Sequence, residues 1–469
     1  MVTEFFILLK QELVITAIIF LLLFLKLGKD RSNESMLSII NFLLFLNLAA
    51  GFFGNQEGML FNDMFRTNGL INLEKNILNL ALWIISLQSY SWLQTHKHVL
   101  EFYLLLLTSL LGMFFMISSG NLLMFYLGLE MSTIPLAAAA NFDLTKRQSS
   151  EAAMKMIISS AFSSGLLLFG ISLVYGVSGT LLFAEIPAHL SASPLHILAF
   201  VLVLSGIAFK ISAVPFHLWT ADVYEGAPVA VTSFLSVVSK AAVLFVFVPI
   251  LYAAFKPLAE TWYHALFVLA LVTIVIGNLF ALRQQNLKRF LAFSSIAQVG
   301  FILVGISGSS QAGMASVIFF VLVYVFSNLA AFGVVSLVSA LTGKEGVADY
   351  KGFYATNPFL SWVLTIALFS LAGVPPTAGF FGKFFLLIAG AAKGNYWLIG
   401  IAALNMVVSF YYYLRVVKAI FMDSNETPIA KLSVPALPRL SLYICLAGII
   451  ITGLASMVYD YIYSLSFGL

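Results

Sequence analysis

The stretch that decides the fold class is residues 226–253, GAPVAVTSFLSVVSKAAVLFVFVPILYA, in which Lys240 is the single charged residue. About 20 apolar residues in a helix cross the roughly 30 Å of hydrocarbon in a bilayer, and this run is longer than that. The rest of the chain resembles it: 61% of the 469 residues are hydrophobic and 9% are charged. Because soluble chains are roughly a quarter charged, a water-soluble core is excluded and lipid is the expected solvent.

Apolar segments of similar length follow one another along the whole chain, which predicts an all-α integral membrane protein with about fourteen transmembrane helices. The N-terminus does not resemble a cleaved signal peptide, because Met1 to Glu12 lacks a basic start and no small-residue cleavage site follows Leu25. The segment 12–27 is therefore the first expected span. The expected spans are 12–27, 36–53, 77–93, 99–118, 120–140, 150–176, 194–221, 226–253, 263–283, 287–307, 313–341, 358–390, 396–421 and 440–466.

The distribution of basic residues between successive loops predicts the orientation. Numbered by the helices that they join, odd and even loops must face opposite sides of the membrane. The excess of basic residues marks the cytoplasmic side, so both termini are expected on the far side of the membrane. The even loops hold only Arg66, Lys75, Lys256 and Lys393. The odd loops hold Lys26, Lys29, Arg31, Lys97, Lys146, Arg147, Arg283, Lys288, Arg289, Lys344, Lys351, Arg415, Lys418, Lys431 and Arg439.

Two segments carry proline where a membrane helix should be continuous: Pro215 in the seventh, and Pro375 and Pro376 in the twelfth. Proline frees backbone groups that lipid cannot satisfy, so such breaks occur where they are buried in protein or line a wet cavity. The breaks are five helices apart, which predicts two inverted five-helix repeats, helices 4–8 and 9–13. The alternative is a pair of ordinary proline kinks. The expected divisions are 1–98, 99–255 and 256–425 for the N-terminal helices and the two repeats, and 426–469 for the C-terminal helix.

Five ionisable residues fall within the expected spans: Glu130, Lys155, Lys210, Lys240 and Lys383. A charge at the bilayer centre costs roughly 2.5 to 3.5 kcal/mol, so we expect these residues to have partners or a use. Burial favours the neutral form of lysine and a nearby carboxylate favours the charged form, so a lysine whose carboxylate approaches and retreats can take up and release a proton. The alternatives are a static Glu130–Lys210 pair and a Lys155 that reaches the membrane surface along its aliphatic stem.

Polar residues on other spans extend this line through water. Asp222 and Glu225 follow the first break and are expected at the membrane surface. Cys445 is the only cysteine, so this chain alone provides no disulfide and no cysteine-bound iron–sulfur or zinc site, and the six histidines show no metal-ligand spacing. The candidate path residues are Ser294, Ser295, Gln298, Ser327, Asn328, Asn405 and Ser409. Each hydroxyl can instead bond its own helix.

At these residues the sequence resembles the antiporter-like, proton-pumping membrane subunits of respiratory complex I, the NADH:quinone oxidoreductase. It is most similar to the subunit N group, because YEGAP at 224–228 matches that group better than subunits M and L. The resemblance extends over nearly the whole chain. It rests on GLEM at 128–131, EAAMK at 151–155, AFSSG at 161–165, FK at 209–210, VPFHLWT at 214–220, DVYEGAP at 222–228, LAFSSIA at 291–297, GVPP at 373–376 and GFFGKF at 379–384.

The resemblance implies a role for each charged residue. Glu130 and Lys210 would be the coupled pair of the first half-channel, with Lys155 as its modulator. Lys240 would be the central relay and Lys383 the end of the second half-channel. Gln298 stands where many relatives are expected to have histidine, so the step past it would depend more on water.

The resemblance also implies partners: subunit M, the small K- and J-type subunits and the lipid bilayer, with no nucleic acid. NADH, FMN, iron–sulfur clusters and quinone would lie in other subunits, and no cofactor or metal is expected in this chain. Three alternatives stay open: a cation/proton antiporter subunit, a membrane subunit of a membrane-bound hydrogenase, and a scaffold whose broken helices only hold neighbouring subunits.

Overall fold

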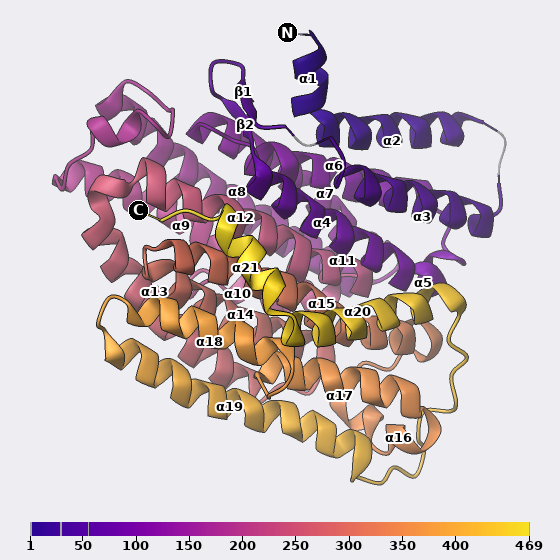
Figure 1. Ribbon diagram of the computed structural model, residues 1–469. Coiled ribbons are helices and arrows are strands. Elements are labelled where there is room, and N and C mark those ends of the chain that lie inside the picture. The colour runs from indigo at the N-terminus through magenta and orange to yellow at the C-terminus, as the bar shows by residue number, and fades with distance from the viewer. Residues whose placement is uncertain (1, 29–30, 55, 469) are drawn as a thin grey trace.

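The computed structural model describes residues 2–28, 31–54 and 56–468, and its helices run roughly alongside one another in one bundle (Figure 1). Met1, Lys29 and Leu469, which enter the predictions on the termini and loop charge, lie outside the described residues. The N-terminal part contains α1 (Val2–Leu8), α2 (Lys10–Leu27), α3 (Asn33–Ala50), the hairpin of β1 (Gly58–Leu60) and β2 (Phe65–Thr67), α4 (Gly69–Gln88) and α5 (Tyr90–Leu93).

The middle of the chain forms a second group of helices, in which two π-helical turns interrupt one long helix. The elements are α6 (Val99–Ile117), α7 (Leu122–Ala140), α8 (Arg147–Ser178), the 3₁₀ turn η1 (Ile186–Ala188), α9 (Pro194–Ile211), α10 (Leu218–Gly226), α11 (Val229–Phe234), the π turn η2 (Leu235–Ser239), α12 (Lys240–Pro249) and the π turn η3 (Ile250–Ala254).

The remaining elements complete the bundle. They are the 3₁₀ turn η4 (Lys256–Leu258), α13 (Ala259–Ala281), α14 (Leu287–Ser307), α15 (Gln311–Thr342), the 3₁₀ turn η5 (Val347–Tyr350), α16 (Phe353–Thr356), α17 (Pro358–Ala372), α18 (Ala378–Ala391), α19 (Tyr396–Phe421), α20 (Ala436–Leu454) and α21 (Ser456–Leu465).

Twelve helices in the described part of the chain are long and apolar enough to cross a membrane by length and composition. Each of the fourteen predicted segments contains a helix. Two segments, the first and the twelfth, account for the difference between fourteen predicted spans and twelve helices of sufficient length and apolar composition. Helix α2 carries Lys10, Glu12 and Lys26 within its 18 residues, and the twelfth segment is divided into α17 and α18, of 15 and 14 residues. The count of fourteen spans stays a prediction.

The predicted helical fold class is confirmed, and the structure adds one short hairpin, in which β1 and β2 pair antiparallel with Met59 opposite Arg66. One detail of the sequence prediction is wrong, because Lys75 is not in a loop: the side chain of Asn68 accepts a hydrogen bond from the Ile71 N–H and starts α4 at Gly69, so Lys75 lies inside that helix.

Both predicted helix breaks are present. Helix α9 ends at Ser212, whose φ of 65° is left-handed, and the freed N–H of Val214 donates to Thr273 Oγ1 at 3.0 Å. Helix α17 ends at Gly373, whose φ of 86° suits a residue without a side chain. The groups that the prolines leave unbonded are thus satisfied by neighbouring helices and not by lipid.

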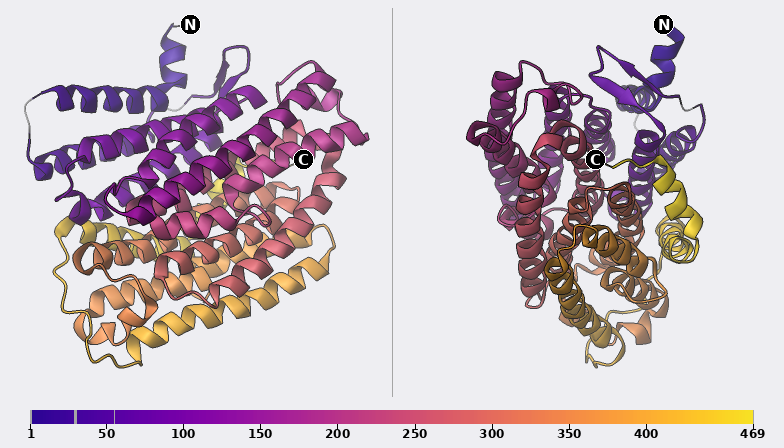
Figure 2. Two further views of the ribbon diagram at one scale, coloured as in Figure 1. Left: turned by 180° about the vertical axis from the view of Figure 1, so that it is seen from behind. Right: turned by 60° about the vertical axis from the view of Figure 1, so that its left-hand side comes forward.

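The core lies along α14, α15 and the α11–α12 helix, which other helices surround on all sides (Figure 2). Outer helices such as α2, α3 and α19 instead expose large apolar side chains, among them Phe24, Phe42 and Leu404. In Figure 1 the loop 179–193 lies at the left of the bundle and the loop 422–435 at the right. Lys240 therefore lies on one of the central helices, while Lys210 and Lys383 lie on α9 and α18, which are part of the surrounding bundle.

Candidate functional site

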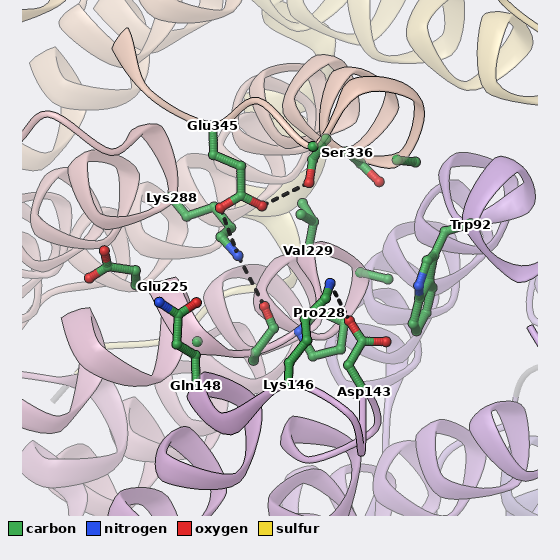
Figure 3. Close-up of a pocket in the computed structure, with 16 residues that line it drawn as sticks. Trp92, Asp143, Lys146, Gln148, Glu225, Pro228, Val229, Lys288, Ser336 and Glu345 are labelled. Carbon is green, nitrogen blue, oxygen red and sulfur yellow. Dashed lines mark hydrogen bonds and ion pairs between the residues drawn. The ribbon is translucent and has the colours of Figure 1, made fainter. Parts of the chain in front are cut away.

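A polar vestibule opens at the end of the bundle formed by the predicted odd loops. It is a cavity of about 380 Å³ between the 143–148 loop region, the start of α11 and the end of α15. Figure 3 shows Lys288 and Glu345 facing each other across it, with an Nζ to Oε2 distance of 3.2 Å. Lys288 Nζ also donates to the Ala227 carbonyl at 3.3 Å. Charged groups of both signs thus line a hollow that reaches the N-terminus of the helix carrying Lys240.

Lys155 differs from the other predicted charges because its side chain is 43% exposed. Its Nζ donates to Asp222 at 2.6 Å and pairs with Glu151 at 2.8 Å. Arg289 binds the second Asp222 oxygen at 2.6 Å and Glu225 at 2.9 Å. The exposure and the ion pairs favour the alternative in which Lys155 reaches the membrane surface along its aliphatic stem, and its depth in the bilayer stays a prediction.

Asp222, which lies beyond the seventh apolar segment, is the centre of this surface network. Burial raises the pKa of the Asp222 carboxyl, but the hydrogen bonds from Lys155 and Arg289 outweigh burial and hold the pKa below its ordinary value. A second cavity of about 210 Å³ lies beside the network and shares Gln148, Glu225 and Gly226 with the vestibule. The network therefore stays charged at neutral pH and borders the entrance.

Glu130 and Lys210 lie in the same part of the bundle but form no ion pair within 4.0 Å in this structure. The Glu130 carboxylate accepts from Ser164 Oγ at 2.5 Å. The Lys210 ammonium donates to Thr133 Oγ1 at 2.8 Å and to Ser160 Oγ at 2.6 Å. Hydroxyls therefore hold both charges, so the structure shows the predicted pair in a separated arrangement.

Lys240 is the first residue of α12 and directly follows the π turn η2. Its side chain is 3% exposed, and its Nζ donates to Ser295 Oγ on α14 at 2.7 Å. The ammonium lies 5.4 Å from the ring centre of Tyr224. Among the described residues no carboxylate pairs with it, so Lys240 depends on a hydroxyl and an aromatic face.

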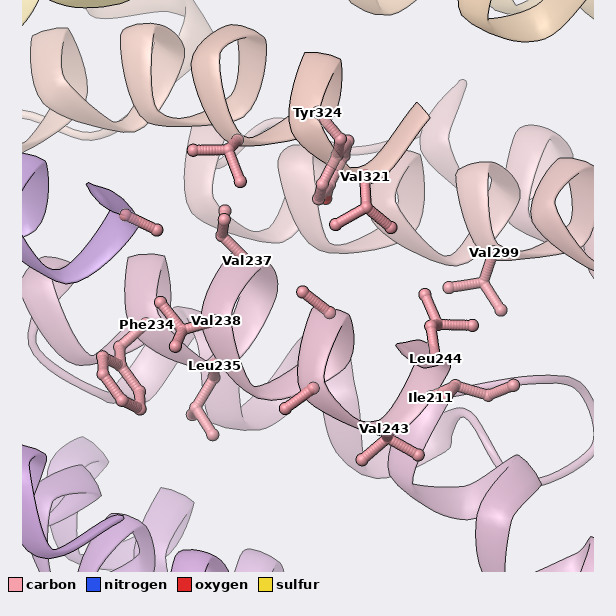
Figure 4. Packing of buried hydrophobic residues seen from close by; sticks show 14 of the residues in the cluster. Ile211, Phe234, Leu235, Val237, Val238, Val243, Leu244, Val299, Val321 and Tyr324 are labelled. Atoms are coloured by element: carbon pink, nitrogen blue, oxygen red, sulfur yellow. The ribbon is translucent and has the colours of Figure 1, made fainter. Parts of the chain in front are cut away.

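An apolar shell surrounds Lys240. Figure 4 shows Val237, Leu244, Val299 and Val321 converging with Tyr324 around this part of the core. Between them and Lys240 lies a cavity of about 10 Å³, which has room for about one water molecule. Its polar lining comes from Lys240, Ser295, Gln298 and Tyr324.

Lys383 is completely buried on α18. Its Nζ donates to the carbonyls of Leu371 and Ala372, at 2.8 and 3.2 Å, and lies 4.9 Å from the ring centre of Phe301. These carbonyls end the half-helix α17, where a positive charge is favourable. The second helix break therefore provides the oxygens that hold this lysine.

A chain of hydrogen bonds runs from the Ser295 region to Lys383. The neighbouring Ser294 Oγ lies 2.5 Å from the hydroxyl of Tyr413. Gln298 Nε2 donates to that hydroxyl at 3.3 Å and to the Leu371 carbonyl at 2.9 Å, the same carbonyl that Lys383 binds. Gln298 Oε1 has no partner among the described residues. The chain thus begins at Ser294, next in sequence to the Lys240 partner Ser295, and passes through the hydroxyl of Tyr413, a residue that the sequence did not single out.

The other predicted path residues have mixed outcomes. Ser327 bonds Ser370 beside the second break at 2.7 Å, and Asn328 donates to Ser236 in η2 at 2.7 Å. Asn405 and Ser409 bond backbone carbonyls of their own helix, so neither joins the chain to Lys383. The side chain of Tyr413, one turn further along the same helix, does so.

A metal centre of three or more His, Cys, Asp or Glu side chains is not found among the described residues. Cys445 is buried on α20. His217, at the first break, is 6% exposed and neither ring nitrogen has a partner in the described part of the chain. It is the histidine nearest to Lys210 in sequence, and its burial was not expected.

Together the broken helices and the buried lysines define a multi-pass membrane protein of the ion-translocating class. Residues 119–409 match the family model described as NADH:quinone oxidoreductase/Mrp antiporter, transmembrane. The chain belongs to this family.

Within the family, similar chains include several named NADH-quinone oxidoreductase subunit N. The one from Phocaeicola vulgatus is 45% identical over 96% of both chains, and that from Desulforamulus reducens is 37% identical over 91% of this chain and 90% of the other. A chain of respiratory complex I from Thermus thermophilus superposes with a TM-score of 0.81 at 28% identity, covering 97% and 98% of the two chains. A chain of the Mrp complex from Dietzia shares the fold, with a TM-score of 0.83 at 19% identity and coverage of 99% and 98%.

Proposed function

We propose that this chain translocates protons as a membrane subunit of NADH:quinone oxidoreductase, and that Lys240 and Lys383 carry the protons. The observation that carries the proposal is the hydrogen-bonded chain that begins at Ser294, next in sequence to the Lys240 partner Ser295, and leads through Tyr413, Gln298 and the Leu371 carbonyl to Lys383. The chain acts as a translocase and has no redox site of its own. NADH, FMN, iron–sulfur clusters and quinone belong to the partner subunits, whose reaction drives the protons.

The chemistry of the relay follows from the residue types. A lysine deep in an apolar shell loses its proton more readily than one in water, and a proton arriving nearby repels the charge already present. The proton of Lys240 passes to water at Ser295 and then along hydroxyl groups toward Lys383. Gln298 orients Tyr413 and a water at its free Oε1, because an amide does not itself carry a proton at neutral pH.

In the first half, Glu130 and Lys210 form the switch. When Glu130 leaves Ser164 and approaches Lys210, the ammonium gains a counter-charge and holds its proton. When Glu130 returns to Ser164, the ammonium is left with Thr133 and Ser160 and releases the proton toward Lys240. Lys155 modulates this pair through the Asp222 network at the surface.

The two halves form inverted repeats of five helices each, with all fourteen segments crossing the membrane and divisions at 1–98, 99–255, 256–425 and 426–469. Helices α8 and α15 support this proposal, because each has 32 residues and ends at a left-handed glycine. Asn121 and Asn286 occupy matching places as well. Each caps the helix before the long one, and their backbones pair with Leu182 and Gly346, just after it.

The vestibule of Lys288 and Glu345 is the cytoplasmic entrance, and both termini lie in the periplasm of a bacterial inner membrane. The excess of basic residues in the odd loops supports this orientation. Exposed apolar faces on the outer helices contact lipid and the neighbouring subunits, which are M on one side and the small K- and J-type subunits on the other.

The deciding experiment uses the assembled complex in sealed vesicles. Lys240→Ala and Lys383→Ala are each expected to abolish or strongly lower the number of protons moved per NADH oxidised. Lys418→Ala is the matched control, because Lys418 is exposed and pairs only with Asp423 at 3.8 Å. Wild-type pumping at undiminished turnover in both lysine variants would contradict the proposal and would favour a scaffold that only holds the neighbouring subunits.

Two further measurements distinguish the proposed pump from an antiporter and from a hydrogenase subunit. Sodium-driven proton movement by the isolated chain in the same vesicles would favour a cation/proton antiporter, for which the Mrp likeness shows only the fold. Co-purification with nickel-containing subunits instead of NADH-oxidising ones would favour a membrane-bound hydrogenase. We expect neither result.

A further inference from the structure

A second buried polar site lies in the N-terminal helices, away from the lysine chain and outside residues 119–409. Glu12 on α2 and Lys75 on α4 form an ion pair of 2.5 Å in which the two side chains are 3% and 1% exposed. Removing two charges from water is expensive unless further hydrogen bonds satisfy them. Here Glu12 Oε2 has no partner among the described residues, so the pair by itself leaves one carboxylate oxygen unsatisfied.

More polar side chains gather around the pair. Gln11 Nε2 donates to Asn72 Oδ1 at 3.3 Å, Asn47 donates to Asn79 at 2.7 Å, and Asn76 donates to the Gly51 carbonyl at 2.9 Å. All five of these side chains are nine-tenths or more buried. Such a concentration of amides within a membrane helix is costly to maintain dry.

The buried side-chain atoms that lack hydrogen-bond partners at this site include both acceptors and donors. Acceptors and donors that lack partners together in one place are satisfied by internal water, since water donates to one and accepts from the other. Among the described residues the unpartnered acceptors here are Gln11 Oε1, Glu12 Oε2, Glu74 Oε1 and Asn76 Oδ1, and the unpartnered donors are Arg66 Nε and Asn79 Nδ2.

Glu74 is the second carboxyl group of the site. It is 2% exposed, and no ion pair within 4.0 Å involves it in the described part of the chain. The charged groups that act on it are Arg66 on β2 and Lys75 beside it on α4, while Glu12 is already bound to Lys75. A buried carboxyl in this position is stable when it holds a proton or when water solvates it.

The β1–β2 hairpin lies at the end of the bundle where the chain begins (Figure 2), and its residue Phe65 contacts the site at Lys75. It is fixed to the bundle by backbone hydrogen bonds from Arg66 N–H to the Ser118 carbonyl, 2.8 Å, and from Gly120 N–H to the Met64 carbonyl, 2.7 Å. Beneath it the Lys75 ammonium lies 5.3 and 5.6 Å from the ring centres of Phe65 and Phe114. The hairpin thus separates the site from the aqueous phase by a thin cover.

We propose that Glu12, Glu74 and Lys75 form a hydrated proton-exchange site under the β1–β2 hairpin, separate from the lysine chain. Its ligands are water and one proton, which leaves the Glu74 carboxyl O–H for a site water and returns by the same route. The carboxylate that remains is stabilised by Arg66 and Lys75. Because α4 packs against α11, α12 and α15, a change of charge at this site acts on the helix that carries Lys240.

Hydration is tested by thiol labelling in the assembled complex. A small, water-soluble thiol reagent is expected to modify Asn76→Cys, while Leu78→Cys, two residues away and completely buried in the apolar core, stays unmodified. Thr67→Cys, on the hairpin, is the second variant should Asn76→Cys not assemble. The native Cys445 is also buried. Its modification by the reagent would show that the subunit had unfolded or opened during labelling. Labelling of neither Asn76→Cys nor Thr67→Cys in an assembled complex would overturn the proposal.

Proton exchange is tested by infrared difference spectroscopy in H₂O and D₂O. We expect a protonated-carboxyl band that shifts in D₂O, is missing in Glu74→Gln and returns in Glu74→Asp. Identical spectra for the wild type and Glu74→Gln would overturn the assignment of the proton. Both measurements are repeated with Lys240→Ala, where the labelling and the band must persist, so failure of the proposed function does not alter this result.

Discussion

Gln298 and Lys383 donate hydrogen bonds to the same backbone oxygen, the carbonyl of Leu371, at 2.9 and 2.8 Å. Leu371 lies in the last turn of α17, where the proline break leaves carbonyls without helical partners. One unbonded carbonyl therefore joins an amide on α14 to an ammonium on α18. From the sequence, Gln298 is a residue that cannot ionise in an otherwise ionisable path. In the structure, its side chain connects Tyr413 on one side of that path to the Leu371 carbonyl and Lys383 on the other.

Gln298→Leu should lower proton pumping because it removes both hydrogen bonds while keeping the volume of the side chain. The loss of a buried hydrogen bond, about 1 to 2 kcal/mol, corresponds to a fall of roughly five- to thirty-fold in the coupled rate. Gln298→His, which keeps a donor, should retain most of the activity. Ser409→Ala is the control, since Ser409 bonds only its own helix. Equal pumping by Gln298→Leu and this control would contradict the assignment.

Tyr413→Phe should impair pumping without loss of assembly. The substitution keeps the ring packing and removes only the hydroxyl that joins Ser294 to Gln298. Tyr103→Phe is the control, because the buried Tyr103 hydroxyl bonds Ser86 at 2.7 Å, outside the chain. We expect a fall of about tenfold for Tyr413→Phe, for the loss of about 1.4 kcal/mol, and little change for Tyr103→Phe. NADH-driven proton uptake by vesicles measures both, and similar losses in the two variants would indicate a packing effect.

The sequence was sufficient for the features that depend on composition and proline. Apolar length predicted helices at each expected position, and the breaks at Pro215 and Pro375 are present because proline cannot complete the helical hydrogen bonds. Lys240 and Lys383 were placed correctly inside the bundle, since a lone lysine within an apolar run has nowhere else to lie.

Partners across helices could not be predicted, because they depend on the facing of helices far apart in the sequence. Tyr413 is one of three consecutive tyrosines in the sequence. Only the packing of α19 against α14 shows that its hydroxyl is the one that bonds Ser294 and Gln298. Lys155 was predicted within a span, but its side chain reaches the surface carboxylate of Asp222. Lys75 was predicted in a loop, but it is buried because Asn68 begins its helix early. At Lys75 a helix cap, and at Lys155 an ion pair between distant helices, decide the position of the side chain, and the spacing of apolar residues predicts neither.

Ser164→Ala should alter the switch in the first half. Without its partner, the Glu130 carboxylate is expected to move to Lys210 and hold the ammonium in the protonated state. A hydrogen bond to a charged group contributes about 1.5 to 3 kcal/mol, enough to shift such an equilibrium by tenfold or more. Ser163→Ala is the neighbouring control, because Ser163 makes only a 3.4 Å contact with the Gly206 carbonyl. Slower NADH-driven pumping in Ser164→Ala but not in Ser163→Ala is the expected result.

Asp222→Asn should weaken the surface network by an amount that does not vary across neutral pH. The folded-state pKa of Asp222 lies below its ordinary value of 3.8, so the stabilisation is complete above that value and is lost only as pH falls through the lower, folded pKa. Thermal unfolding of the assembled complex from pH 6 to pH 8 should show a constant difference between variant and wild type, on the order of 1 kcal/mol or less for so exposed a network. A difference that disappears within this range would contradict the pKa direction.

The buried pair of Glu12 and Lys75 should show a strong asymmetry between its two single variants. Removing one partner of a buried ion pair costs roughly 3 to 5 kcal/mol because the other charge is left alone. Lys75→Met leaves Glu12 without its cation and Glu74 with Arg66 alone, whereas Glu12→Gln leaves Lys75 still beside Glu74. We therefore expect Lys75→Met to lower the heat resistance of the assembled subunit more than Glu12→Gln. The double variant Glu12→Leu with Lys75→Met should recover part of the loss, since no charge of the original pair remains buried. The fraction of the subunit that remains assembled after heating measures all three, and a double variant less stable than Lys75→Met would show that the two residues do not act as a pair.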